Sequence, residues 1–83
     1  MSREMFINDC PFCRQGIQKI VFEIPTGEFF VECDECMLQW ESVEDAARDT
    51  GRCGHTHLGE QRDATLEEIQ ANGWEKYIQF MGQ

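Results

Sequence analysis

Residues 17–24, "IQKIVFEI", alternate in a way that is typical of a β-strand. Ile20, Phe22 and Ile24 fall on one side of an extended chain, with Gln18 on the same side, and the segment is rich in β-branched and aromatic types. "PTGE" follows and has the Pro and Gly of a turn. "FFVEC" then predicts a returning strand, so we expect a β-hairpin, to which "MLQWE" at 37–41 adds a third strand.

The second half of the chain changes to helical patterns. "SVEDAARDTG" predicts a short helix in which Ser42 is the N-cap, Glu44 and Asp45 lie in the first turn, and Gly51 is the stop. The composition of "RCGHTHLGEQRD" predicts a loop.

A second helix is predicted for "TLEEIQANG", where Thr65 and Glu68 have the spacing of a capping box and Gly73 stands near the end. In the tail "WEKYIQFMGQ", four apolar residues have the spacing that would place them on one face of a helix: Trp74, Tyr77, Ile78 and Met81. Trp74, Ile78 and Phe80 would also share one side of a strand. We expect helix.

Four of the five cysteines form two C-x2-C pairs, Cys10 with Cys13 and Cys33 with Cys36, separated by nineteen residues. The predicted hairpin lies between the pairs and would bring them together. Four thiolates can then surround one ion tetrahedrally, which suits zinc. We therefore expect one structural Zn²⁺, with iron as the alternative because four cysteines also bind iron.

"CPFC" and "CDEC" resemble the two knuckles of a zinc ribbon. The resemblance covers residues 10–36 and implies a hairpin that is stabilised by the bound metal. Zinc knuckles often have Gly after the second cysteine, whereas Arg14 and Met37 follow here, and the first Gly is Gly16. The expected fold is a single small α+β domain over 1–83, with a zinc ribbon of two to three antiparallel strands at 10–41 and two or three short helices packed on it at 42–83.

Other chemistry at the cysteines is less consistent with the pattern. "CPFC" is similar to a dithiol redox motif of the thioredoxin type, but that motif opens a helix, and a strand is predicted here. Cys53, His55 and His57 in "CGHTH" could form a second metal site. The alternative interpretation, which we favour, is an ordinary polar loop with a spare thiol and two histidines. We found no nucleophile with a base, phosphate loop or His-Glu metal motif, so we expect no enzyme.

The net charge of −9 is concentrated in one segment. Residues 32–49 contain seven acids against Arg48 alone, a net charge of −6. Such a field repels phosphate backbones and attracts basic surfaces, and the seven bases of the chain are scattered. We therefore expect a basic protein partner rather than nucleic acid. Aromatic and acidic residues of this segment are the predicted contact surface: Glu32, Asp34, Glu35, Trp40, Glu41, Glu44 and Asp45.

A small acidic protein of this kind resembles the immunity proteins of bacterial polymorphic toxin systems, including contact-dependent inhibition, and "TLEEIQANGWEKY" is similar to the tail of some short members. The resemblance implies that the protein binds and blocks a cognate toxin, for example a nuclease. The alternatives are a small phage or plasmid regulator similar to the restriction-alleviation group, which also begins with "CPFC"-like knuckles, and an accessory subunit of transcription or RNA machinery. No apolar run approaches the ~20 residues of a membrane span, and no secretory signal is visible, so we expect the cytoplasm.

Overall fold

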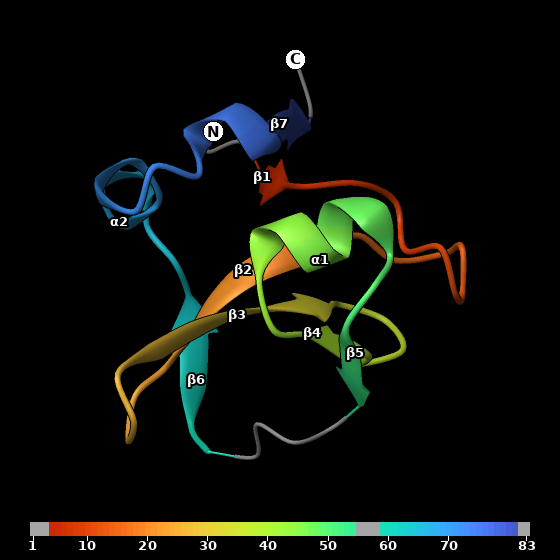
Figure 1. Ribbon diagram of the computed structural model, residues 1–83, viewed down its shortest axis with the longest axis horizontal. Helices are drawn as coiled ribbons and strands as arrows, with labels where there is room; N and C mark the ends of the chain where they lie inside the picture. The colour runs from red at the N-terminus through yellow and green to blue at the C-terminus, as the bar shows by residue number, and fades with distance from the viewer. Residues whose placement is uncertain (1–3, 55–58, 82–83) are drawn as a thin grey trace.

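The computed structural model describes residues 4–54 and 59–81. These residues form seven strands, two α-helices and one 3-10 helix (Figure 1). Their order is β1 (Glu4–Phe6), β2 (Gln18–Glu23), β3 (Glu28–Cys33), β4 (Gln39–Trp40), α1 (Val43–Arg48), β5 (Arg52–Gly54), β6 (Gln61–Asp63), α2 (Leu66–Ala71), η1 (Glu75–Tyr77) and β7 (Gln79–Met81). The expected small α+β fold is confirmed.

The predicted hairpin is the centre of a five-stranded antiparallel sheet with the order β5-β4-β3-β2-β6. Strands β2 and β3 pair along their whole length, from Gln18 opposite Cys33 to Glu23 opposite Glu28. The third predicted strand, β4, pairs next to β3, where Trp40 lies opposite Val31. The hairpin and its third strand are therefore confirmed.

Both faces of the hairpin are covered, so the burial along β2 does not alternate as the sequence suggested. Ile20 on one face and Val21 on the other are each 5% exposed, and Ile24, expected on the inner side, is 47% exposed. One face packs against α1, where Val31 and Trp40 join Val43 in the hydrophobic core. A strand that is buried on both sides lacks a simple period of two.

Helix α1 begins as predicted and ends earlier than predicted. The Ser42 Oγ accepts a hydrogen bond from the Asp45 backbone N–H at 3.1 Å, which confirms the N-cap. The helix ends at Arg48, and Asp49 is the C-cap in the left-handed conformation, with φ 55°. The predicted stop at Gly51 is therefore wrong by two residues, because Asp tolerates this conformation better than most residues do.

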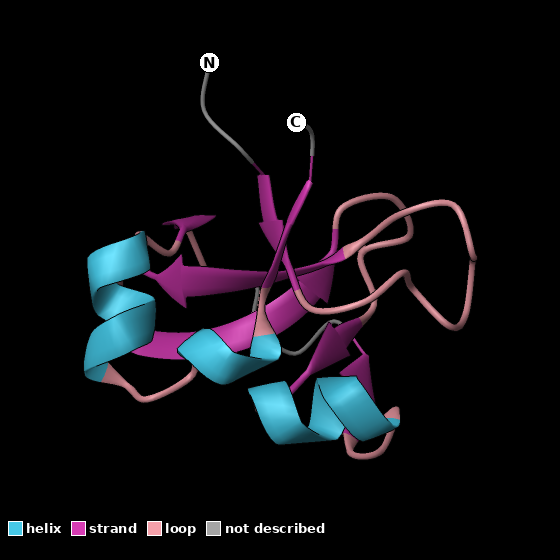
Figure 2. Ribbon diagram, turned by 90° about the horizontal axis from the view of Figure 1, so that it is seen from above, coloured by secondary structure: helices cyan, strands magenta, loops and turns pink. Residues whose placement is uncertain are grey.

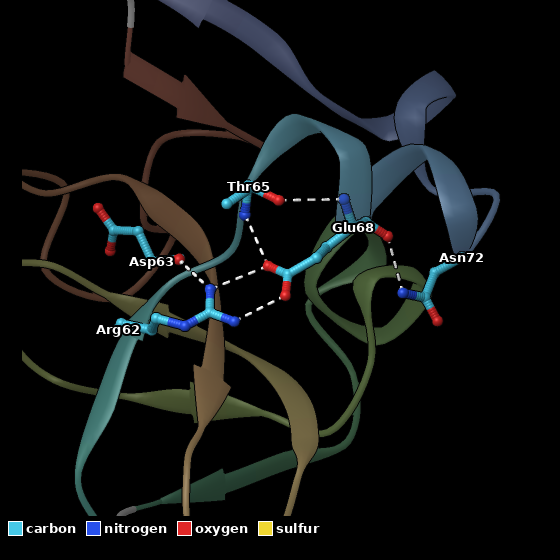
Figure 3. Close-up of polar contacts among 5 residues, drawn as sticks. All are labelled: Arg62, Asp63, Thr65, Glu68 and Asn72. Atoms are coloured by element: carbon cyan, nitrogen blue, oxygen red, sulfur yellow. Dashed lines mark hydrogen bonds and ion pairs between the residues drawn. The ribbon is translucent and has the colours of Figure 1, made fainter.

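Helix α2 is fixed at its first turn by the predicted capping box (Figure 3). The Thr65 Oγ1 accepts from the Glu68 N–H at 3.2 Å, and the Glu68 carboxylate accepts from the Thr65 N–H at 2.9 Å. The same carboxylate binds the Arg62 guanidinium through two hydrogen bonds of 2.9 and 2.7 Å. Arg62 also lies over the Phe22 ring, 4.5 Å from its centroid, so this contact joins α2 to the central hairpin.

Two sequence predictions in the second half are wrong. The segment expected to be a loop contributes β5 and β6, which pair with β4 and β2 at the two edges of the sheet. The tail expected to be a helix has only the three-residue η1 and continues as β7, which pairs antiparallel with β1. These strands have three residues each, which is too short for a hydrophobic period, and their pairing partners lie far away in the sequence.

Candidate metal centre

The four cysteines of the two pairs meet at one end of the hairpin. Cys10 and Cys13 lie in the loop before β2, Cys33 is the last residue of β3, and Cys36 lies in the loop that joins β3 to β4. In both views these long loops lie at the end of the molecule opposite α2 (Figure 1, Figure 2). The four Sγ atoms all lie within 4.8 Å of one another, so the predicted convergence is confirmed.

Two of the distances between the sulfurs are close to the edge of a tetrahedral four-thiolate site. Cys10 Sγ is 3.7 Å from Cys36 Sγ, and Cys13 Sγ is 3.6 Å from Cys33 Sγ. A tetrahedron with metal–sulfur bonds of about 2.3 Å has edges of about 3.8 Å, whereas a disulfide would need an S–S distance of about 2 Å. The described cysteines are free thiols. Their arrangement therefore matches a four-thiolate site for one ion of the size of zinc or iron.

The backbone around the two pairs follows one repeated pattern. Arg14 and Met37, each directly after the second cysteine of its pair, have positive φ angles of 59° and 67°. The Arg14 N–H donates to the Cys10 carbonyl at 3.0 Å, and the Met37 N–H donates to the Cys33 carbonyl at 3.2 Å. Both loops thus make the same turn after their second cysteine, although neither has Gly at the position where Gly is favoured.

Backbone N–H groups point at the sulfurs. The N–H groups of Glu35 and Cys36 both donate to Cys33 Sγ at 3.4 Å. Hydrogen bonds from the backbone of Gln15 and Gly16 lower the pKa of the Cys13 thiol to about 6. Such donors stabilise a thiolate and compensate part of the charge that four thiolates would bring into the site.

Burial acts in the opposite direction on the thiols of the second pair, Cys33 and Cys36. Burial raises the pKa of Cys33 to about 12 and also raises the pKa of Cys36, where a backbone hydrogen bond from Leu38 opposes it. The thiols of Cys33 and Cys36 are therefore difficult to ionise without a cation. A bound divalent ion would supply the positive charge that keeps all four as thiolates.

Gly16 has a role that the sequence analysis did not assign. A Cβ atom at this position would lie 2.7 Å from Cys33 Sγ and 2.6 Å from Asp34 Oδ1, so only Gly fits against the second pair. The next residue is tied to the same loop, because the Ile17 N–H donates to Asp34 Oδ1 at 2.9 Å and the Asp34 N–H donates to the Ile17 carbonyl at 3.1 Å. The sequence signal for this close contact was a single Gly three residues after the first cysteine pair.

Two of the residues predicted to contact a partner are part of the interior. Trp40 is 0% exposed and its indole N–H donates to Asp49 Oδ1 at 3.2 Å. Glu32 is 8% exposed, and its carboxylate accepts hydrogen bonds from the side-chain amides of Gln39 and Gln61. The prediction that Trp40 and Glu32 form a contact surface is therefore wrong: both complete the packing of the sheet.

The other predicted acids lie at the surface in two separate places. Asp34 and Glu35 are exposed on the loop between the last two cysteines. Glu41 and Glu44 are exposed and Asp45 is half-buried, all near the start of α1. This end of α1 lies beside η1, since the Tyr77 hydroxyl donates to Glu44 Oε2 at 3.3 Å, and it points away from the cysteine loops (Figure 1). The acidic segment therefore does not form one continuous face.

The alternative second metal set, Cys53, His55 and His57, lies outside the residues whose side chains the structure describes. Within the described ranges, the one group of metal-ligating side chains that converges is the four-cysteine site.

The chain matches no protein-family model, no curated protein and no solved structure. None of the helices in the described part of the chain has the length and hydrophobicity that crossing a membrane requires.

Proposed function

We propose that the four cysteines bind one structural Zn²⁺ in a module of the zinc-ribbon type. The observation that carries this proposal is the convergence of all four Sγ atoms within 4.8 Å. The two left-handed knuckle residues and the N–H groups aimed at Cys33 support it. No ligand position would remain open for substrate, so the ion would stabilise the fold and would not catalyse a reaction.

Zinc is distinguished from iron by measurement of the bound ion. Elemental analysis of protein purified without chelator should give one zinc per chain, and replacement by Co²⁺ should give the intense visible absorption of a tetrahedral thiolate site. A stoichiometric iron content with the colour of a ferric thiolate centre would contradict the assignment of zinc.

We further propose that the protein is a non-enzymatic inhibitor that binds a basic protein, in the role of an immunity protein for a cognate bacterial toxin. The net charge of −9 and the position of exposed acids on the metal-bearing loop support this role. Complementary charge would speed association with a positively charged cleft, such as that of a nuclease, and would set specificity. The partner would act on nucleic acid, and this protein would occupy the partner's cleft so that nucleic acid could not bind there.

The test is capture of the partner by zinc-loaded protein from the cells that make it, followed by an activity assay of that partner. Glu35→Lys is the variant of choice, because Glu35 is exposed on the cysteine loop; Glu67→Lys on α2 is the control with the same change of charge. We expect Glu35→Lys to weaken binding and reduce its salt dependence, and Glu67→Lys to have little effect. A captured protein whose activity is unchanged by saturating wild-type protein would contradict the role of inhibitor.

A further inference from the structure

We infer that the protein partner docks on the knuckle face, defined as the exposed side chains around the four cysteines: Asp9, Phe12, Arg14, Asp34, Glu35 and Met37. This inference rests on the proposed function and narrows it to one surface and one partner chemistry. The occupant is a basic protein surface with an apolar pocket for Phe12 and Met37.

The knuckle face carries two large apolar side chains in solvent. Phe12 is 64% exposed and Met37 is 49% exposed. Each directly adjoins a cysteine of the four-cysteine site, Cys13 or Cys36, and these two sulfurs lie within 4.8 Å of each other, so the backbone of both residues lies at the same end of the molecule. Apolar anchors surrounded by polar groups are the usual composition of a protein interface.

The backbone conformation and the exposure at position 37 do not favour a methionine. Met37 has φ 67°, where a side chain costs free energy and Gly does not, and half of it is exposed. A bulky apolar residue kept in a strained and solvated position is better explained by contact with a partner than by stability. The flexible and polarisable methionine side chain is well suited to such contacts.

The charge of the knuckle face selects a basic protein over nucleic acid. The exposed acids of this face are Asp9, Asp34 and Glu35, and its exposed base is Arg14. Arg52 also approaches this region, with its guanidinium carbon 5.6 Å from the Phe12 ring centroid, but it forms two hydrogen bonds of 2.7 and 2.6 Å with the Asp49 carboxylate. Four thiolates around a divalent ion would add a charge of about −2 beneath this surface. Phosphate groups would be repelled from it.

The acids at the start of α1 are a weaker site by the same criteria. Among the described residues, the exposed large hydrophobic side chains are Phe12, Met37 and Ile24, so α1 presents none. Ile24 follows β2 at the end of the hairpin that bears the turn, away from the cysteines, and is 47% exposed. It is therefore a matched control for Met37, with nearly the same exposure.

The experiment is site-specific photo-crosslinking in the cells that make the protein. A photoreactive phenylalanine analogue replaces Phe12, Met37, Ile24 or Glu44, one position at a time, and each variant is first shown to bind its metal. We expect positions 12 and 37 to crosslink to the same basic protein and position 24 to give no specific product.

The crosslinked protein, purified, is then the probe in a binding assay. Met37→Gly should weaken the affinity about tenfold or more, as truncation of an anchor does, with unchanged metal content. Ile24→Ser should bind as the wild type does. Equal affinity of Met37→Gly and wild type would overturn the inference.

Other crosslinking results also decide the matter. Products with a second copy of this chain or with nucleic acid at positions 12 and 37 would refute docking of a basic protein. Crosslinks from position 44 alone would refute the knuckle face and leave the proposed inhibitor role standing. A basic protein captured at 12 and 37 but not inhibited would leave the docking surface standing and refute that role. Absence of a basic protein at positions 12 and 37 would refute the knuckle face, and the inhibitor role would then be decided by the capture and activity assay described above.

Discussion

Arg14 and Met37 are equivalent residues in the two halves of the four-cysteine site. Each follows the second cysteine of its pair, and both have the left-handed backbone, with φ 59° and 67°. The N–H of each donates to the carbonyl of the first cysteine of its own pair. The two cysteine pairs therefore use the same turn, which explains how two separate loops can each direct a pair of sulfurs to one point.

This pairing predicts that Gly at either position stabilises the protein. A left-handed residue other than Gly costs about 1–2 kcal/mol, and the greater freedom of Gly in the unfolded chain returns about 0.5–1 kcal/mol of that. Arg14→Gly and Met37→Gly should each raise the free energy of unfolding by about 0.5–1 kcal/mol in denaturant titrations of the metal-bound protein. A loss of stability in both would mean that the turn is not the one described.

Met37→Gly is then informative in two assays at once. The knuckle-face inference predicts that this variant is more stable than the wild type and yet binds the partner more weakly. A change that improves folding and impairs binding cannot be explained by damage to the structure.

Gly16→Ala should weaken metal binding because the added methyl group would overlap sterically with the second cysteine pair. The added Cβ would meet Cys33 Sγ at 2.7 Å and Glu35 Cβ at 2.8 Å. We expect weaker zinc affinity in competition with a chromophoric chelator, together with lower stability.

The control for this variant is Gly27→Ala in the hairpin turn. Gly27 has φ +74° and nothing within 4 Å of an added Cβ, so Ala there should cost about 1 kcal/mol of backbone strain and leave zinc affinity unchanged. Equal loss of zinc affinity in the two variants would contradict the close packing of Gly16 against the centre.

The Arg62–Glu68 pair predicts a dependence of stability on pH. The hydrogen bonds from Arg62 and from the Thr65 backbone lower the pKa of Glu68 from 4.5 to about 2. Because the folded state has the lower pKa, this contribution is fully present above about pH 5.5 and is lost as the pH falls through 4.5 towards 2.

The measurement compares the wild type with Glu68→Gln in urea unfolding between about pH 6.5 and 4. The four-cysteine site is common to both proteins, so the difference in their stabilities reports on Glu68. That difference should shrink towards acid pH. A difference that stays constant over this range would show that the carboxylate does not have its lowered pKa.

The sequence was most informative where the determinants are local. The hairpin, the N-cap Ser42, the capping box of Thr65 and Glu68, and the meeting of the four cysteines were all predicted, because each depends on residues close in sequence or on a spacing with few geometric solutions. Glu32 and Trp40 were misassigned because composition shows a charge or an aromatic ring but not the face of the sheet on which it lies.

The short strands could not be predicted for a different reason. The three-residue β5, β6 and β7 gain their hydrogen bonds from partners elsewhere in the chain, and β7 pairs with the first strand. Their own residues show no hydrophobic alternation, so these strands are determined by pairing with distant strands and not by local sequence. The left-handed turn at Arg14 and Met37 was likewise invisible, since the usual Gly is absent at both positions.

Removal of the metal should unfold at least the half of the chain that contains the cysteines. Structural zinc in small domains contributes on the order of 10 kcal/mol of folding free energy, and Cys33 is fully buried in the core. Cys33→Ser, or treatment with a strong chelator, should abolish the cooperative thermal transition seen by circular dichroism. An unchanged spectrum and melting temperature would show that the fold does not need the ion.

The most direct measurement is the metal content of natively purified protein, taken together with a titration of its thiols. The account predicts one zinc ion per chain and four cysteines that become reactive only when a chelator removes the metal. Protein that contains no stoichiometric metal, with Cys10, Cys13, Cys33 and Cys36 freely reactive or joined in disulfides, would contradict it.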